Sequence, residues 1–322
     1  MLIAVTGATG FVGGHVVSSL LESGHEVVGY GRRPDPPWQP RPGLEYQRWD
    51  ITSGPIDGAA GAVVHCAGSV MEWGSDEHFS ANNVIGTQNV LDSFRHARVF
   101  VHISTASVYN LSTRKHGLNE ESPLATHFLS GYSRSKVAAE RLVARVPGNS
   151  VVLRPHIVYG RGDTKILPGL LAMRRLGALV VPGDGQSRLS VTHVQNLADA
   201  VVLAIERRAG HEVFNIADSL TGTVDELLTS LQSAFGLVPR IWHVPASAAW
   251  RAAGAVEWLH RSILSNRAPR LTRFLVAQLA FDFTLDIRRA VEMLGYRPTR
   301  SYPEAFRELA LEKGAELQSS VR

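Results

Sequence analysis

The chain begins with a short apolar run, Leu2–Thr6, and continues through Thr6-Gly7-Ala8-Thr9-Gly10-Phe11-Val12-Gly13 into a helical segment. The first two glycines permit a tight turn and a close approach of backbone N–H groups to a pyrophosphate, and Gly13 lets the helix pack against the strand. The helix N-terminus then adds an anion site. A glycine-rich turn alone can be purely structural, but between a strand and a helix this one predicts dinucleotide binding.

Beyond this turn, short apolar runs alternate with helix-length segments. The apolar runs cover residues 26–29, 62–66, 99–104 and 150–154, and the helical segments cover 13–23, 81–96 and 132–146. Strands that alternate with helices indicate crossover units and a parallel sheet. The predicted fold class is therefore α/β, with a Rossmann-type doubly wound parallel sheet.

A second part of the molecule is indicated further along the chain. Glycines and prolines interrupt the alternation after residue 160, residues 213–217 have the pattern of one more strand, and the remainder is mostly helical by pattern. We expect a dinucleotide-binding domain at 1–162, to which 190–218 return. A smaller, mostly helical C-terminal substrate-binding lobe would then comprise 163–189 and 219–322.

Tyr132 and Lys136 stand four residues apart at the start of a predicted helix, so they share one helix face. A phenol is a poor acid or base near neutral pH unless a nearby ammonium lowers its pKa, and Lys136 can supply that charge. The pair also occurs on many solvated helices. After a dinucleotide-binding turn, however, the catalytic interpretation is favoured.

Hydroxyl side chains end the predicted strand at 99–104. At the carboxyl end of a parallel strand they point toward the crevice where such sheets bind ligands, so Thr105 or Ser104 is a candidate to hydrogen-bond a carbonyl oxygen. The alternative is that these hydroxyls only cap the following turn.

Five motifs together resemble the extended short-chain dehydrogenases/reductases, the NAD-dependent epimerase/dehydratase superfamily. They are the glycine-rich turn, Ser104-Thr105-Ala106-Ser107-Val108-Tyr109, Tyr-x-x-x-Lys at 132–136, Leu153-Arg154-Pro155-His156-Ile157-Val158-Tyr159-Gly160, and Val191-Thr192-His193-Val194-Gln195-Asn196-Leu197-Ala198-Asp199-Ala200. Within the superfamily, Met71-Glu72-Trp73-Gly74 and residues 83–91 and 269–274 most resemble the 3β-hydroxysteroid dehydrogenase and 2-alkyl-3-oxoalkanoate reductase branch.

The resemblance implies roles for individual residues. Thr105 takes the place of the catalytic Ser/Thr, Tyr132 that of the proton donor, and Lys136 that of the residue that holds the cofactor ribose and lowers the phenol pKa. Positions implied to contact the cofactor are Gly7, Thr9, Gly10, Phe11, Val12, Gly13, Asp50, Ile51, Cys66, Ala67, Gly68, Asn83, Tyr132, Lys136, Pro155, His156 and Ile157. Asn83 matches an asparagine that kinks a helix and has a structural alternative. Substrate candidates are Ser107, His156 and Met71.

The residues at the end of the second predicted strand indicate whether the chain binds NAD or NADP. An acidic residue there would bind the ribose of NAD, whereas arginine accommodates the 2′-phosphate of NADP. This chain has Gly31 and Arg32, so NADP(H) is favoured and NAD(H) remains possible. The alternative is that Arg32 is only a solvated loop charge.

The predicted activity is interconversion of a hydrophobic ketone and a secondary alcohol by hydride transfer. An apolar helical stripe and several aromatic side chains in the C-terminal region favour such a substrate, and they include Trp242, Trp250, Trp258, Ile263, Phe274 and Phe281. The alternative is that the apolar stripe only packs the lobe together. A role at a membrane surface is less well supported, because the polar face of the helix lacks a row of lysines. A segment at 183–188 whose Arg188 resembles a phosphate-binding arginine keeps a rival open, a nucleotide-sugar epimerase or dehydratase with tightly bound NAD. A cofactor-sensing binding protein is the non-enzymatic alternative.

Composition excludes several other classes. The 33 Lys and Arg residues are scattered and the net charge is only +4, which argues against nucleic-acid binding. There is no His-Glu-x-x-His motif and one cysteine, Cys66, so we expect no bound metal, no disulfide and a cytoplasmic location. No apolar run is long enough for stable membrane insertion. A homodimer is expected, since relatives pair the helices that correspond to 81–94 and 132–146.

Overall fold

The computed structural model describes residues 1–113, 115–146, 148–163, 178–207, 210–236, 240–262 and 268–319. At its centre is a seven-stranded sheet with the order β12-β7-β5-β4-β1-β2-β3, and all of its strand pairs are parallel. Its strands are β1 (Leu2–Thr6), β2 (Glu26–Gly31), β3 (Leu44–Arg48), β4 (Ala62–His65), β5 (Val99–Ile103), β7 (Asn149–Pro155) and β12 (Glu212–Ile216). The predicted Rossmann-type parallel sheet is confirmed.

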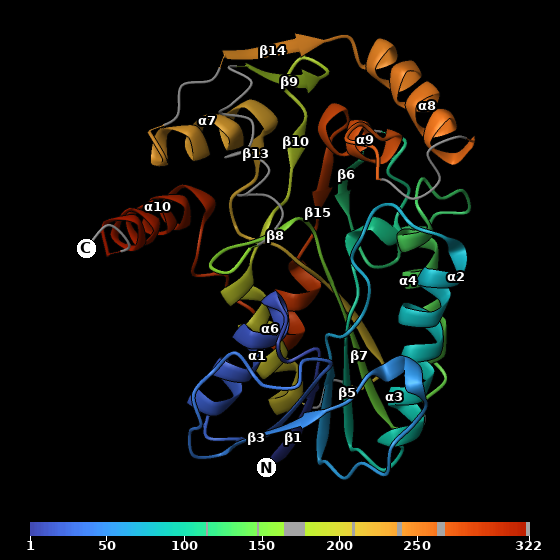
Figure 1. Ribbon diagram of the computed structural model, residues 1–322, viewed down its shortest axis with the longest axis vertical. Helices are drawn as coiled ribbons and strands as arrows, with labels where there is room; N and C mark the ends of the chain where they lie inside the picture. The colour runs from blue at the N-terminus through green and yellow to red at the C-terminus, as the bar shows by residue number, and fades with distance from the viewer. Residues whose placement is uncertain are drawn as a thin grey trace.

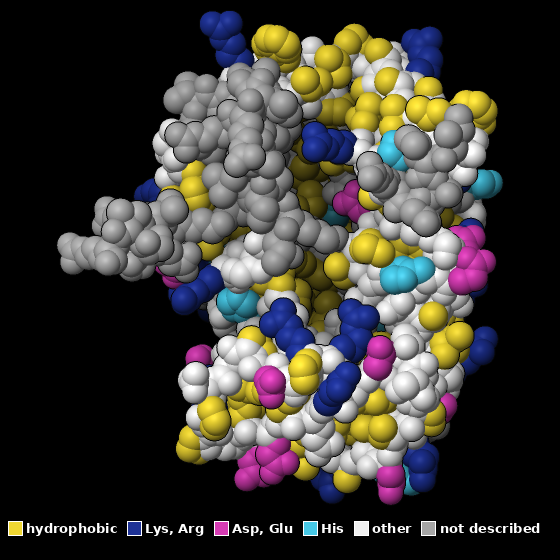
Figure 2. All heavy atoms as spheres, in the orientation of Figure 1, with side chains coloured by type: hydrophobic (Ala, Val, Ile, Leu, Met, Phe, Trp, Pro, Cys, Tyr) yellow, Lys and Arg dark blue, Asp and Glu magenta, His cyan; other side chains and the backbone are white. Residues whose placement is uncertain are grey.

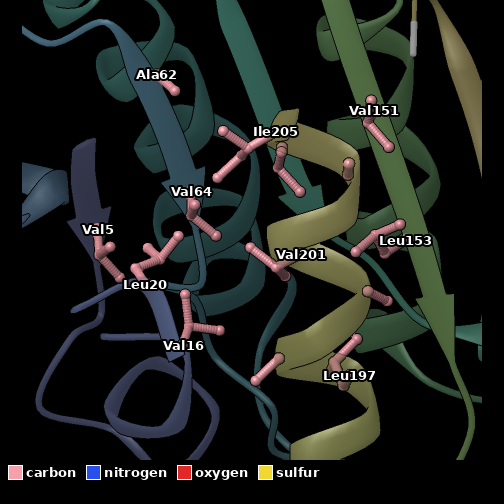
Figure 3. Close-up of a cluster of buried hydrophobic side chains, with 14 of the residues drawn as sticks. Val5, Val16, Leu20, Ala62, Val64, Val151, Leu153, Leu197, Val201 and Ile205 are labelled. Carbon is pink, nitrogen blue, oxygen red and sulfur yellow. The ribbon is translucent and has the colours of Figure 1, made fainter. Parts of the chain in front are cut away.

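Helices cover both faces of the sheet (Figure 1). Helices α1 (Phe11–Glu22) and α6 (Val194–Arg207) lie on one face, and α3 (Gly86–Ser93) and α4 (Gly131–Val143) lie on the other. Successive residues of a strand point to opposite faces, so Ile3 and Val5 of β1 pack with α1 and α6 while Ala4 packs on the opposite side. Figure 3 shows the first of these two cores, between the strands and α1 and α6.

A smaller lobe lies beyond the carboxyl ends of the central strands (Figure 1). Its helices are α7 (Val224–Ala234), α8 (Ala246–Ser262), α9 (Arg273–Ala280) and α10 (Tyr302–Ser319). A four-stranded sheet is formed by β6 (Lys115–Leu118), β10 (Arg188–Leu189), β13 (Gly222–Thr223) and β15 (Phe283–Leu285), and a parallel pair by β9 (Ala178–Pro182) and β14 (Arg240–Val244).

The lobe contains strands that the sequence pattern did not indicate, because this part of the chain was expected to be mostly helical. Strand β6 comes from inside residues 1–162, yet it pairs with β15 of the C-terminal region. Of the predicted lobe segment 163–189, residues 164–177 lie outside the described part of the chain. None of the described helices is long and apolar enough to cross a bilayer.

The strand order reverses between β1 and β4, because the chain winds outward from β1 to β3 and then returns to β4. In open α/β sheets, ligands bind in the crevice at such a reversal, outside the carboxyl ends of the strands. The topology therefore places the site where the glycine-rich turn after β1 meets the loop after β4.

Candidate active site

The glycine-rich turn requires glycine for two separate reasons. Gly7 has φ +67, and a Cβ atom there would lie 2.7 Å from the backbone nitrogen of Ala67 in the loop after β4. A Cβ atom on Gly13 would lie 2.1 Å from the carbonyl oxygen of Gly7. Because the turn, the helix and the neighbouring loop approach so closely, the backbone N–H groups at the start of α1 stay accessible to a phosphate.

At the end of β2, the position next to the cofactor cleft is small and uncharged. A Cβ atom on Gly31 would lie 2.9 Å from the Thr9 hydroxyl oxygen and 3.1 Å from the Tyr46 hydroxyl oxygen. Arg32 follows and is exposed. The pKa of Asp50, after β3, is held below its usual value by the backbone N–H of Thr52, with a smaller effect of Arg32. Arg32 and Asp50 therefore border the same end of the cleft.

The loop after β4 is tied down by Asn83. This residue lies in η2 (Ser80–Ile85), a π-helical turn, and its buried amide accepts a hydrogen bond from Ser69 N at 2.7 Å and donates to Ser69 O at 3.0 Å. It also donates to the Ser135 hydroxyl of α4 at 2.8 Å. Asn83 thus joins the loop of Cys66, Ala67 and Gly68 to the helix of the predicted catalytic pair, and these contacts support its structural interpretation.

Thr105, Tyr132 and Lys136 meet beside the carboxyl end of β5. Burial raises the pKa of Tyr132 to about 12, and a side-chain hydrogen bond with Thr105 acts in the opposite direction. Thr105 also accepts a hydrogen bond from Ser107 N at 3.1 Å, which caps the 3-10 turn η3 (Ala106–Val108). The influence of Thr105 on Tyr132 agrees with the functional interpretation, and its hydrogen bond with Ser107 N agrees with the capping interpretation.

The Lys136 ammonium is held on the sheet side of the site. Its Nζ atom donates to the Ile103 carbonyl oxygen at 2.6 Å and lies 3.3 Å from His102 Nε2. Burial lowers the pKa of Lys136 to about 8, against the opposing influence of Glu140 and Cys66. Lys136 is not among the groups that most shift the pKa of Tyr132. Its ammonium is directed toward the backbone and an imidazole.

A directional chain of hydrogen bonds passes under the cleft through His65. The Thr87 hydroxyl donates to Asn83 O at 2.6 Å, so it accepts from His65 Nε2 at 2.9 Å. His65 Nδ1 is then the acceptor for the Thr6 hydroxyl at 2.7 Å. The chain links the end of β1 to the π-helical turn, and burial lowers the pKa of His65 to about 3, which keeps the ring neutral.

A buried ion pair connects α4 to the central sheet. The Arg154 guanidinium of β7 donates to both carboxylate oxygens of Glu140 on α4, at 3.0 and 2.6 Å, and to the Tyr109 hydroxyl at 2.8 Å. Ser104 donates to the same carboxylate at 2.5 Å. This network fixes α4 relative to β5 and β7. Because Thr105 follows β5 and Lys136 lies on α4, the network also sets how these two residues are placed relative to each other.

The segment that follows β7 is strained. Ile157 has φ +44, a left-handed conformation that costs energy for a β-branched residue. His156, before it, is buried, and its Nδ1 lies 2.8 Å from the Ser190 carbonyl oxygen. Its Nε2 has no hydrogen-bond partner among the described residues. Strain next to an unpartnered buried nitrogen is typical of functional segments.

A cavity of about 740 Å³ lies between the start of α4 and the lobe. Ser130 and Gly131, directly before Tyr132, line it, together with Met71 and other residues of the loop after β4. Figure 2 shows this face hollowed between the sheet and the lobe. The full lining is Met71, Glu72, Trp73, Gly74, Ser75, Asp76, His78, Phe128, Leu129, Ser130, Gly131, Arg134, Glu257, Arg261, Ala268, Thr272 and Phe274.

The substrate candidates fall in different places. Met71 lines the cavity, whereas Ser107 borders a separate hollow of only about 10 Å³. Of the aromatic side chains considered from the sequence, Phe274 lines the cavity and Trp250 packs against Phe281 with ring centroids 6.3 Å apart. The side chains of Trp242 and Trp258 are exposed. Ile263 lies outside the described residues.

The described residues contain no group of three or more His, Cys, Asp or Glu side chains suited to a metal ion.

This fold and this cleft define an NAD(P)-dependent oxidoreductase of the Rossmann type. Residues 3–217 match the NAD dependent epimerase/dehydratase family. The chain belongs to that family, which confirms the resemblance to the extended short-chain dehydrogenases/reductases.

Curated relatives include reductases and dehydrogenases. The chain is 31% identical to 2-alkyl-3-oxoalkanoate reductase of Stenotrophomonas maltophilia (strain K279a), over 98% of this chain and 100% of the relative. It is 30% identical to 3-beta-hydroxysteroid dehydrogenase of Mycolicibacterium neoaurum, over 95% of this chain and 89% of the relative.

Solved structures share the fold at lower identity. MoeE5 in complex with UDP-glucose and NAD has a TM-score of 0.77 at 24% identity, covering 98% of this chain and 100% of that chain. UDP-glucuronic acid 4-epimerase from Bacillus cereus in complex with NAD has a TM-score of 0.74 at 23% identity, covering 95% and 96%. These similarities show the architecture.

Several residues of the site were not identified from the sequence. His65 and His102 lie inside apolar strand patterns, and Glu140 and Arg154 are 14 residues apart with an ordinary helix and loop between them. A polar residue within a buried strand was the available signal for the two histidines, since buried polar groups need partners. Nothing in the local pattern identified their partners.

Proposed function

We propose that the protein is an NADP(H)-dependent reductase or dehydrogenase that interconverts a hydrophobic ketone and a secondary alcohol. The observation that carries this proposal is that Thr105 lies close enough to Tyr132 to lower the pKa of its phenol, next to Gly131 in the wall of the cavity. A ketone bound there would accept hydrogen bonds from both side chains. Burial raises the phenol pKa to about 12, so Tyr132 is protonated near neutral pH and carries the proton that reduction of a ketone consumes, although a lower pKa would make it a stronger acid.

The cofactor contributes the hydride, and the chain holds it at the reversal of strand order. The turn from Gly7 to Gly13 would bind the pyrophosphate, Asp50 and Ile51 the adenine side, and the loop from Cys66 to Gly68 the ribose. Lys136 would hold the ribose near the nicotinamide, and the strained segment at Ile157 would border the nicotinamide. NADP(H) is supported by Gly31, which leaves no carboxylate for a ribose hydroxyl, and by the exposed Arg32 beside it.

The cofactor preference is tested by Arg32→Ala. If the guanidinium pairs with the 2′-phosphate, the variant should bind NADPH at least about tenfold more weakly and NADH almost unchanged, as measured by fluorescence titration. The matched control is Arg33→Ala, on the neighbouring exposed residue. Equal losses for both cofactors, or a native preference for NADH, would reject the assignment.

A hydrophobic substrate is supported by Trp73, Phe128 and Phe274 in the cavity and by the names of the curated relatives. Three of the charged groups in the cavity wall are already paired, Asp76 with Arg134 of the same wall and Glu257 with Arg273. A single cysteine is in keeping with a cytoplasmic enzyme.

The rival activity is that of a nucleotide-sugar epimerase or dehydratase with tightly bound NAD. Arg188, its candidate phosphate-binding residue, donates to Thr221 Oγ1 at 3.2 Å and is not part of the cavity wall. To decide between the two activities, kcat/KM for long-chain 3-oxo compounds and cyclic ketones is compared with kcat/KM for UDP-sugars. Turnover of the ketones is measured by NADPH oxidation. We expect turnover of the ketones, and turnover confined to the UDP-sugars would favour the rival.

A further inference from the structure

Lys136 can donate three hydrogen bonds and accept none when it is charged. Two of its donors are directed into the sheet, toward the Ile103 carbonyl oxygen at 2.6 Å and His102 Nε2 at 3.3 Å. Nε2 of His102 is therefore the acceptor, so the imidazole is neutral and its proton is on Nδ1.

His102 is buried, and its Nδ1 has no hydrogen-bond partner among the described residues. A buried donor without a partner is unfavourable, and an apolar side chain of the same size would avoid that cost. Unlike an apolar side chain, the imidazole provides a hydrogen-bond acceptor at Nε2. The contact with Lys136 is thus the feature that accounts for a histidine at this position.

His65 holds the ring of His102 without adding charge. The two residues are direct neighbours on β4 and β5, and their ring centroids are 5.2 Å apart. Both nitrogens of His65 are occupied, by Thr6 and Thr87, which fixes its orientation and its tautomer. Burial and the nearby Lys136 ammonium lower the pKa of both rings, so both remain neutral beside a cation.

We propose that His102 is a positioning residue for Lys136: its neutral imidazole accepts a hydrogen bond from the ammonium and, with the Ile103 carbonyl, presets where the third donor points. The catalytic value of this placement rests on the proposed function, whereas the anchoring itself does not. With two donors fixed, the remaining one is directed away from the sheet. A ribose hydroxyl can then bind Lys136 without first ordering a long, flexible side chain.

Other ionisable groups face this ammonium from each element packed around it. Glu140 is on α4, His65 is on β4 and Cys66 follows it, and Arg154 of β7 occupies both carboxylate oxygens of Glu140. The influence of Glu140 and Cys66 raises the pKa of Lys136, and burial lowers it to about 8. His102 itself faces Lys136 and His65.

The two possible roles of His102 predict opposite shifts. Removing an acceptor from a buried ammonium destabilises the charged form, so His102→Leu should lower the pKa of Lys136 by about one unit. If His102 only filled space, its loss would admit water and raise that pKa toward the usual lysine value. His102→Gln, whose amide oxygen can replace Nε2 as acceptor, should restore the native pKa.

The measurement is a pH titration of the chain carrying [13Cε]lysine, followed by NMR without added cofactor. The sequence contains four lysines, Lys115, Lys136, Lys165 and Lys313, so the spectrum is simple, and Lys136→Met identifies the resonance of interest. Phe100→Leu is the matched control, because Phe100 is a buried residue two positions earlier on β5. We expect it to leave the Lys136 titration unchanged.

An unchanged or raised Lys136 pKa in His102→Leu would overturn the proposal. Activity provides a second readout: the basic limb of the kcat/KM profile for ketone reduction should move to lower pH in His102→Leu and return in His102→Gln. If no ketone is reduced but the NMR shift is observed, the proposed function fails and the anchoring role of His102 stands.

Discussion

Tyr132 is the residue on which the proposed chemistry depends most directly. Tyr132→Phe removes the proton donor and leaves the ring, so kcat for ketone reduction should fall at least about a hundredfold while cofactor binding survives. Steady-state kinetics and a cofactor titration measure the two quantities. Near-normal turnover would remove Tyr132 from the mechanism. Tyr46→Phe, which alters another hydroxyl at the cleft, is the control and should keep turnover within about threefold.

Lys136 imposes a pH dependence on stability. Its pKa is about 8 in the folded chain and 10.5 as the ordinary value, so between these pH values the unfolded chain binds a proton that the folded chain does not. Stability therefore rises with pH across this window, by on the order of 3 kcal/mol for this group. The variant Lys136→Met lacks this pH-dependent contribution to stability. In urea unfolding, the native chain should gain stability relative to this variant from pH 8 to pH 10, and a constant difference would contradict the burial of a charged ammonium.

At the scale of elements, the contact between α4 and β7 rests on one buried ion pair. Glu140→Gln leaves the Arg154 guanidinium buried without a charged partner, and we expect a loss of about 3–5 kcal/mol in the free energy of unfolding. Replacing both residues, as Glu140→Leu with Arg154→Met, should recover part of that loss. The exposed pair of Arg300 and Glu308 is the control, and Glu308→Gln should cost at most about 1 kcal/mol. The free energy of unfolding is measured in denaturant for the native chain, Glu140→Gln, the double variant and Glu308→Gln. Equal losses for Glu140→Gln and Glu308→Gln would refute this account of the contact.

The elements also show what a sequence can and cannot reveal. The strands and helices of the central sheet follow from local periodicity, and the glycine-rich turn follows from a motif whose spacing has a direct geometric cause. The contacts of His102 and Glu140 do not, because they join residues 34 and 14 positions away. Strand β6 was missed for the same reason: its apolar pattern is weak, and its partner β15 lies more than 160 residues further along the chain. Tyr132 and Lys136 were predicted from their shared helix face after the glycine-rich turn and from the resemblance, which periodicity alone would not have supplied.

For the whole molecule, we predict a homodimer through residues 81–94, which include most of η2 and all of α3, and through α4. Ile85, at the end of η2, is 51% exposed, and we expect the dimer to cover its side chain. Light scattering should give twice the chain mass at micromolar concentration, and Ile85→Asp should shift the protein to monomer. Val291→Asp, on an exposed apolar residue of η5 (Ala290–Leu294), is the control. A monomer at all concentrations would refute the prediction.

The crowding around Gly31 limits how this enzyme can change its cofactor during evolution. A single exchange to aspartate, the simplest route to NAD, would bring the new Cβ atom to 2.9 Å from the Thr9 hydroxyl oxygen and 3.2 Å from the Thr9 methyl carbon. Rotation of Thr9 does not relieve both contacts, because its side chain is branched at Cβ. A lineage that acquired the acidic residue would first need a smaller residue at position 9, where change touches the phosphate-binding turn itself. The proposed NADP(H) preference would therefore be protected by the order in which mutations must arrive.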